Sequence, residues 1–433
     1  MLTTVIACFI IGYTLIVFEH QLRLDKTVSA LLMGAICWAL VSLGDLPLVN
    51  HLHQPDSLEH TLFHHIGRIA EILIFLIGAM SIVELIDLHK GFAVITNKLK
   101  AENKMQMLWI ICGLGFILSS VLDNLAATIV LVSLLRRLVP DKNERLWFVS
   151  FAVIAANAGG AWSPIGDVTT TMLWIGKKVT TAGLISTLVV PSILCILIPL
   201  LIASFKKIFK GPITKPEHLL NLSGKTELLG SSNLMLYAGV GALVFVPIFK
   251  TITHLPPYLG MMLSLGIMWM ISEYARPEKN MSVEKKHHYS THHALSRIEL
   301  PSILFFLGIL LAVGSLESLG LLNQLAASLD EVIPIREAVV LILGVASAII
   351  DNVPLVAAAM GMYTFPTDDP LWHFIAYSAG TGGSMLIIGS AAGVAAMGME
   401  KINFIWYLKN ITWIAFAGFL AGAAAFLLMN KFL

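Results

Sequence analysis

The chain has 433 residues, of which 57% are hydrophobic and 13% are charged, with a formal net charge of +1. Its mean hydropathy of +0.82 is far above that of a water-soluble protein, so a soluble globular fold is nearly excluded. The small net charge gives no basis for binding nucleic acid. We therefore expect an all-α, multi-pass membrane protein whose main partner is the lipid bilayer.

Eight apolar runs are long enough to cross the roughly 30 Å hydrocarbon core, which takes about 17 to 25 helical residues. The first run begins at Met1 without a basic leader or a cleavage site, so we expect a retained first helix rather than a signal peptide. All four cysteines lie inside apolar runs without CxxC spacing, which argues against a metal or disulfide framework. The predicted spans are 2–18, 27–44, 68–88, 183–206, 233–250, 256–274, 299–320 and 402–430.

Four further apolar regions differ from these spans because Asp, Asn, Gly, Pro or Ser residues interrupt their centres. A bilayer tolerates a broken helix only where protein or water satisfies the freed backbone groups. We therefore expect discontinuous helices in these regions, and such breaks are candidate transport sites. The interrupted regions are 105–139, 146–178, 336–364 and 371–399.

The distribution of Lys and Arg predicts which loops face the cytoplasm. Region 105–139 has basic loops on both sides, so we expect it to enter from the cytoplasm, turn at its centre and return as a re-entrant hairpin. Region 336–364 has weakly charged, acid-leaning flanks and is expected to be the matching hairpin from the outside. The basic loops are 89–104, 136–145, 206–225 and 276–297, whereas 45–67 and 321–335 contain neither Lys nor Arg.

A spaced pair of acidic motifs indicates an internal repeat. Glu71 precedes the Asp-Asn pair at 123–124 by 52 positions. Glu299 precedes the Asp-Asn pair at 351–352 by the same 52 positions, a shift of 228 between the halves. Because the loop charges give the halves opposite topology, we predict the inverted repeat that secondary transporters commonly have. The predicted division is a first half over 1–206 with repeat 1 from about 68, a cytoplasmic linker over 207–232 and a second half over 233–433.

Three aspartates in the interrupted regions, Asp123, Asp167 and Asp351, are candidates for cation binding. An ionised carboxylate inside a membrane costs at least about 2.5–3.5 kcal/mol on insertion scales, so its presence requires a function. Na⁺ is a hard cation that suits carboxylate, amide, hydroxyl and carbonyl oxygens. Carboxylates can also carry protons when burial raises their pKa, so one site can exchange Na⁺ for H⁺. The neighbouring oxygen donors are Asn124, Asn157, Ser163, Thr169, Thr170, Ser347, Asn352 and Ser384.

Four motifs in these regions resemble one known family. They are Leu-Asp-Asn at 122–124, NAGGAWSPIGDVTT at 157–170, Ile-Asp-Asn at 350–352 and SAGTGGS at 378–384. Together they resemble the NhaD-type sodium/proton antiporters of the ion transporter superfamily, over nearly the whole chain. The resemblance implies Na⁺ (or Li⁺)/H⁺ exchange across a bacterial inner membrane, serving pH homeostasis, by hairpins and broken helices that work against a scaffold. Such scaffolds usually dimerise, so a homodimer is expected.

The resemblance also implies a set of functional residues, with no enzymatic activity and no cofactor. Na⁺ is expected at Asp123, Asn124, Asn157, Asp351 and Asn352. Glu71 and Glu299 are candidates for a proton relay, although they could merely anchor helix ends at the interface. The implied set is Glu71, Asp123, Asn157, Asp167, Thr169, Thr170, Glu299, Ser347, Asp351, Asn352, Ser378 and Ser384.

Two other functions remain open at this point. A Na⁺-coupled carrier of an anionic solute, such as a dicarboxylate or an oxyanion, would present cationic or helix N-terminal groups to its substrate. The acidic Asp-Asn motifs, with no Lys or Arg beside them, favour a cation instead. An intramembrane protease could use paired aspartates, but the Asn after each Asp fits ion coordination better. Histidines at 51–65 and 287–293 could bind metal or sense pH, although solvated loop residues are the better interpretation.

Overall fold

The computed structural model describes residues 1–22, 24–49, 55–97, 101, 103–212, 228–275 and 291–432. The middle of the predicted linker at 207–232 lies outside the described residues, as do parts of the basic loops and of both histidine groups. Within the described ranges the chain is helical apart from its connections and one pair of two-residue strands. These strands, β1 (Leu48–Val49) and β2 (Pro55–Asp56), pair antiparallel before the longest helix.

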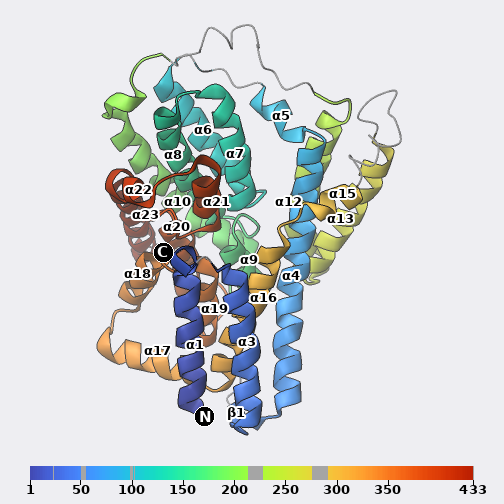
Figure 1. The fold of residues 1–433 in the computed structure, drawn as a ribbon, viewed down its shortest axis with the longest axis vertical. Helices are drawn as coiled ribbons and strands as arrows, with labels where there is room; N and C mark the ends of the chain where they lie inside the picture. The colour runs from blue at the N-terminus through green and yellow to red at the C-terminus, as the bar shows by residue number, and fades with distance from the viewer. Residues whose placement is uncertain are drawn as a thin grey trace.

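One group of six helices, which we call the frame, extends along the long axis of the molecule (Figure 1). It consists of α1 (Leu2–Val17), α3 (Lys26–Leu43), α4 (Leu58–Leu88), α12 (Ser232–Thr253), α13 (Pro257–Tyr274) and α16 (Leu300–Ser318). Helix α4 runs along most of the molecule, with the α1–α3 pair at one end and the α12–α13 pair at the other (Figure 1). Helix α3 packs on α16, and α13 packs on α4, so each pair lies against a long helix of the other half.

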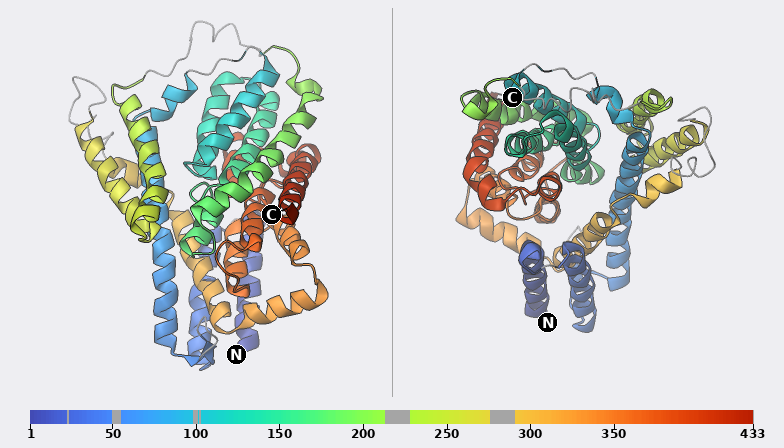
Figure 2. Two further views of the ribbon diagram at one scale, coloured as in Figure 1. Left: turned by 180° about the vertical axis from the view of Figure 1, so that it is seen from behind. Right: turned by 45° about the horizontal axis from the view of Figure 1, so that its top comes forward.

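The second group of helices, which we call the bundle, lies beside the frame (Figure 2). Its members from the first half are α6 (Lys104–Ser119), α7 (Asn124–Leu138), α8 (Lys142–Gly160), α9 (Val168–Ile175) and α10 (Thr181–Ser204). Its members from the second half are α18 (Arg336–Ala346), α19 (Asn352–Met362), α20 (Pro370–Gly382), α21 (Ala391–Glu400), α22 (Phe404–Asn410) and α23 (Thr412–Phe432). The bundle contacts the frame where α19 meets α16 and where α9 meets α4.

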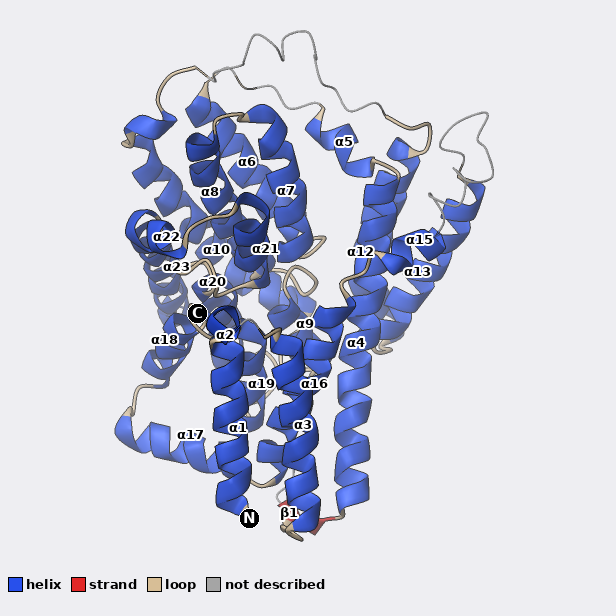
Figure 3. Ribbon diagram, viewed as in Figure 1, coloured by secondary structure: helices blue, strands red, loops and turns tan. Residues whose placement is uncertain are grey.

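Short helices connect these groups. Helix α2 (Glu19–Leu22) lies at the turn between α1 and α3, and α5 (Gly91–Thr96) follows α4. Helix α15 (Thr291–Ser296) precedes α16, and α17 (Leu321–Val332) follows it. A short 3₁₀ turn, η1 (Lys207–Phe209), follows α10. Figure 3 shows that helices make up almost all of the described chain.

The predicted class, an all-helical multi-pass membrane protein, is confirmed. Within the described residues, six helices are long and apolar enough to cross a bilayer, namely α3, α4, α10, α12, α16 and α23. Helices α1 and α13 occupy two other predicted spans but are not among these six, and α1 has only 16 residues.

Two predicted boundaries differ from the observed ones. Helix α4 begins at Leu58, ten residues before the predicted span 68–88, because the Ser57 hydroxyl caps it by accepting a hydrogen bond from the His60 N–H at 3.3 Å. The prediction of solvated loop histidines is therefore wrong for His60, His64 and His65, which lie in α4; His65 is buried and hydrogen-bonded to Ser318 at 2.8 Å. The predicted run 402–430 is divided at Ile411 into α22 and α23. Hydropathy alone does not register such caps and breaks.

Glycines allow the paired helices of the bundle to approach closely. A Cβ at Gly159 of α8 would clash with the main-chain oxygen of Phe116 in α6. In the second half, a Cβ at Gly382 of α20 would clash with the main-chain oxygen of Gly344 in α18. Small residues at helix contacts are typical of membrane bundles, where close backbone approach replaces the hydrophobic effect between helices. In each half, one glycine therefore allows close packing of two helices: α8 on α6 in the first half and α20 on α18 in the second.

We expect Gly159→Ala to lower the stability of the purified protein by about 1–3 kcal/mol, because the added methyl forces α8 away from α6. The measurement is thermal unfolding in detergent. Gly113→Ala is the matched control. Gly113 lies on α6, the helix that Gly159 contacts, and nothing lies within 4 Å of a Cβ placed there. Equal unfolding temperatures for the two variants would contradict the close contact.

Candidate functional site

Four helices of the bundle begin close to its centre, and each has a polar N-cap. The caps are Asp123 for α7, Asp167 for α9, Asp351 for α19 and Ser390 for α21. Each cap side chain accepts a hydrogen bond from an N–H in the first turn of its helix, at 2.7–3.2 Å. The positive end of a helix dipole stabilises negative charge at its N-terminus. Three carboxylates are therefore placed where ionised oxygens are least costly.

Asp167 is the centre of a buried hydrogen-bond network and is only 1% exposed. The Asn124 amide donates to its Oδ2 at 2.5 Å, and the Thr169 hydroxyl donates to its Oδ1 at 2.7 Å. The Asn352 amide, from the second half, donates to the same carboxylate at 3.4 and 3.5 Å. Both predicted Asp-Asn motifs thus direct their asparagines at one carboxylate.

Asn157 extends this network into the second half of the chain. Its Oδ1 accepts from the Asn124 amide at 3.1 Å. Its Nδ2 donates to the hydroxyls of Ser384 and Ser390, both at 2.9 Å. We call these residues the polar junction. Its members are Asn124, Asn157, Asp167, Thr169, Asn352, Ser384 and Ser390.

Ser390 is a member that sequence reasoning missed as a site residue. It caps α21 after the break that follows α20, just as Asp167 caps α9 after the break that follows α8. The signal available in the sequence was this equivalent position in the second glycine-rich break. Ser390 does not stand out among the acidic candidates, because the second break has a hydroxyl at the position where the first break has the Asp167 carboxylate.

Three other predicted residues lie next to the polar junction rather than in it. The Thr170 hydroxyl donates to the main-chain oxygen of Asp167 at 2.9 Å. The Ser347 hydroxyl donates to the main-chain oxygen of Ala379 at 2.8 Å, which joins α18 to α20. The Ser378 hydroxyl is buried and has no hydrogen-bond partner among the described residues.

The two predicted hairpin tips have different surroundings. Asp123 lines a pocket of about 530 Å³, and its φ of 144° is one that L-residues rarely adopt. Asp351 does not line this pocket; its Oδ2 instead lies 3.0 Å from the Nζ of Lys26 at the start of α3. One tip carboxylate therefore faces a cavity, whereas the other faces a lysine of the frame. The expectation that no Lys or Arg lies near either Asp-Asn motif is thus wrong for Asp351, because α3 brings Lys26 to it from a distant part of the chain.

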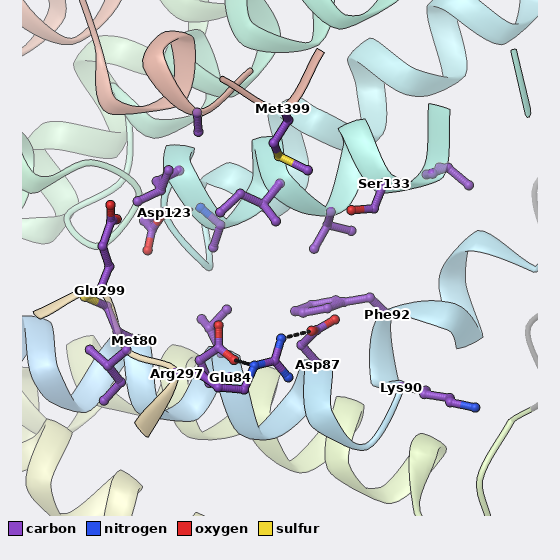
Figure 4. Close-up of a pocket in the computed structure, with 18 of the residues that line it drawn as sticks. Met80, Glu84, Asp87, Lys90, Phe92, Asp123, Ser133, Arg297, Glu299 and Met399 are labelled. Carbon is purple, nitrogen blue, oxygen red and sulfur yellow. Dashed lines mark hydrogen bonds and ion pairs between the residues drawn. The ribbon is translucent and has the colours of Figure 1, made fainter. Parts of the chain in front are cut away.

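The pocket lies between the frame and the bundle, with walls from α4, α5, α7 and α21 and from the segment before α16. Glu299 reaches toward Asp123 across its inner end (Figure 4). The guanidinium of Arg297 in the wall is bound by Glu84 at 3.3 Å and by Asp87 at 3.4 Å. The pocket thus presents carboxylates near Asp123, and its arginine is already paired.

Glu71 is not brought to this pocket. It lies half-buried in α4, and within the described residues it has no hydrogen-bond or ion-pair partner. Of the two glutamates that the spacing of 52 relates, Glu299 therefore lines the pocket beside Asp123, whereas Glu71 does not line it.

A buried ionic cluster was not predicted. The side chain of Glu400, at the end of α21, is 2% exposed. Its oxygens lie 2.5 Å from the Nε of Arg136 and 2.7 Å from the Nε of Arg145. A buried carboxylate needs such paired donors, and this cluster ties α21 to α7 and α8. We assign it a structural role, because it lies at the far end of α21 from the polar junction.

Comparison with known proteins places the chain in a family. Residues 13–373 match the family described as citrate transporter, CitMHS. The chain belongs to this family. Sodium/proton antiporter 2 of Arabidopsis thaliana is 45% identical over 429 residues, 98% of this chain and 99% of the relative. Sodium/proton antiporter 1 of the same plant is 44% identical over 429 residues, 98% of this chain and 72% of the relative.

Bacterial members of the family are also similar. The Na⁺/H⁺ antiporter NhaD of Alkalimonas amylolytica is 30% identical over 452 residues, covering 98% of this chain and 90% of the relative. The resemblance to NhaD-type antiporters that the four motifs predict is confirmed. The chain is an integral membrane protein whose relatives are transporters.

We expect Asn157→Ala to lower stability by about 1–3 kcal/mol, because Asn124, Ser384 and Ser390 each lose a buried partner. Thermal unfolding in detergent would measure this loss. Asn410→Ala is the control, since the Asn410 amide donates to Trp406 within α22 and lies outside the bundle centre. If Asn157→Ala unfolds no earlier than Asn410→Ala, the polar junction does not hold the two halves together.

Proposed function

We propose that the protein is a secondary antiporter that exchanges Na⁺ or Li⁺ for H⁺, without enzymatic activity or a cofactor. The observation that carries this proposal is the convergence of both Asp-Asn motifs on Asp167. Carboxylate, amide and hydroxyl oxygens gathered in a dry centre are the ligands that a hard cation requires. The names of the relatives support the same exchange.

In this proposal the cation binds at the tips and the proton binds to the same carboxylates. Na⁺ is held by Asp123, Asn124, Asn157, Asp351 and Asn352, and competition with protons at Asp123, Asp167 and Asp351 couples the two fluxes. Glu299 would pass protons between the pocket and Asp123, and Glu71 remains the candidate for the corresponding proton relay in the first half. The supporting oxygens are those of Thr169, Thr170, Ser347, Ser378 and Ser384.

We further propose alternating access by an inverted repeat over the two predicted halves, 1–206 and 233–433, joined by the linker. The pairs α6–α7 and α18–α19 would be the two re-entrant hairpins, and α8–α9 and α20–α21 the discontinuous helices. The correspondence of the pairs α1–α3 and α12–α13 in the frame supports this division. The bundle would move against the frame.

The remaining parts of the proposal concern the assembly and its membrane. The basic loops orient the α5 side of the molecule to the cytoplasm, so the pocket beside Asp123 would open inward. We also propose a homodimer in a bacterial inner membrane with a role in pH homeostasis, as the motifs that resemble NhaD-type antiporters imply.

The family description favours one alternative, a Na⁺-coupled carrier of an anionic solute such as citrate. An anion would need free cationic groups in the pocket. The Arg297 guanidinium is bound by two carboxylates, and Asp123 and Glu299 add negative charge to the same pocket. Lys90 is the other basic residue of the lining, and it also takes part in an interaction. These charges support the cation.

The test is Na⁺-dependent dissipation of a preset pH gradient in proteoliposomes. We expect Na⁺ and Li⁺, but not K⁺, to collapse the gradient with the intact protein. Asp123→Asn and Asp351→Asn should each reduce the rate at least about tenfold, a loss of about 1.4 kcal/mol, because an amide can neither exchange a proton nor neutralise a cation.

Glu331→Gln on the exposed face of α17 is the control for removing one carboxylate, and it should exchange at the normal rate. A gradient that Na⁺ leaves intact between about pH 6.5 and 9.5, a range spanning neutral and raised carboxylate pKa values, would refute the antiporter. Na⁺-driven uptake of labelled citrate by the same vesicles would then establish the alternative.

A further inference from the structure

Lys26 is the first residue of α3, and its ammonium group lies where the frame meets the bundle. Helix α1 extends from the N-terminal end toward the middle of the molecule and α3 runs back beside it, so the start of α3 lies near the middle of the molecule (Figure 1). Its Nζ is 3.0 Å from Asp351 Oδ2 and 4.5 Å from the ring centre of Phe305 in α16. The aromatic face and the carboxylate together fix the position of the ammonium.

The ion pair links two parts of the chain that are 325 residues apart. Lys26 belongs to the frame, and Asp351 belongs to the tip between α18 and α19 in the bundle. The other charges near Lys26 are acidic, namely those of Glu19, Asp25 and Glu299. No second basic side chain is recorded beside Asp351 within the described residues. A single lysine therefore compensates the charge of this tip.

An ammonium group and a Na⁺ ion cannot both occupy the same side of this carboxylate. Each carries one positive charge, and at about 4 Å two such charges repel by about 4 kcal/mol even at an effective dielectric constant of 20. The lysine ammonium has only donors and cannot serve as a ligand for a cation. Asp351 can thus bind a cation through Oδ2 only after Lys26 has moved away.

We propose that Lys26 is a tethered counter-ion that competes with the transported cation for Asp351 and is displaced when that cation binds. This inference rests on the proposed antiport. The lysine keeps Asp351 neutralised while the tip is empty, so the bundle need not carry an uncompensated charge. The Lys26–Asp351 ion pair also holds the tip against the frame until a cation replaces the lysine. Asp123, which faces the pocket, has no such partner among the described residues.

The competition predicts an unusual kinetic result. Lys26→Met removes the competitor, so the KM for Na⁺ should fall about three- to tenfold, and the maximal rate should fall as well because nothing displaces the bound ion. Lys26→Arg keeps the charge and should restore a KM close to that of the intact protein. Lys409→Met, which removes an exposed lysine on α22, should change neither value. The measurement is the Na⁺ dependence of the exchange rate in proteoliposomes.

A KM for Lys26→Met that is unchanged or raised, in vesicles whose intact protein exchanges Na⁺ for H⁺, would refute the role of Lys26 and leave the antiporter standing. Absence of exchange by the intact protein would instead refute the antiporter itself. The two failures are therefore distinguishable.

A second measurement uses the intact protein and does not depend on a variant that folds. Amine acetylation followed by mass spectrometry reports how accessible each lysine is. Replacing choline chloride with NaCl should increase acetylation of Lys26 at least about twofold, because an ammonium group without its carboxylate partner loses its proton more easily, and the neutral amine is the form that reacts. Lys409 should be acetylated equally in both salts. A Lys26 whose acetylation is the same or lower in NaCl is a fixed structural ion pair, and the proposal is then wrong.

Discussion

The arrangement of the bundle depends on how one buried carboxylate is satisfied. Asp167 is almost completely buried, and an unpaired charge in such a place would cost several kcal/mol. Hydrogen bonds from Asn124, Thr169 and Asn352, together with the N-terminus of α9, offset this cost. Asn124 and Thr169 come from the first half of the chain and Asn352 from the second, so the full set of donors is complete only when the halves meet.

The same requirement accounts for the helix breaks. A helix that stops inside the protein leaves N–H and C=O groups without partners, and each must be paired elsewhere. Polar caps satisfy the N–H groups at the starts of α7, α9, α19 and α21. Glycines let the preceding arms approach until backbone meets backbone, as at Gly159 and Gly382. The polar residues of the breaks thus stabilise the fold, and in the proposed antiporter the same residues would bind the cation.

The sequence predicted the parts of this design that repeat or interrupt a pattern. Long apolar runs predicted the membrane class, and the Asp-Asn motifs and the stretch at 157–170 predicted most of the polar junction. Ser390 was not predicted as a site residue, because a serine in an apolar run is common and usually only contributes to helix packing. The ion pairs of Glu400 and Lys26 were not predicted, because each residue lies at a helix end, where a charge is ordinarily solvated. Only tertiary contacts with Arg136 and Asp351 show that these two charges are paired.

The two tips are related by sequence but not by environment, and this difference is informative about transport. If both tips faced the same cavity, an ion could cross without any movement, and the gradient of one ion could not drive the other. In the structure, Asp123 reaches a pocket whereas Asp351 is covered by the frame. Since the bundle contacts the frame chiefly through α19 on α16 and α9 on α4, a shift along these two contacts would alter both environments together. A single position of the bundle would then expose Asp123 and cover Asp351 at the same time. Exchange of two ions would require this kind of coupling.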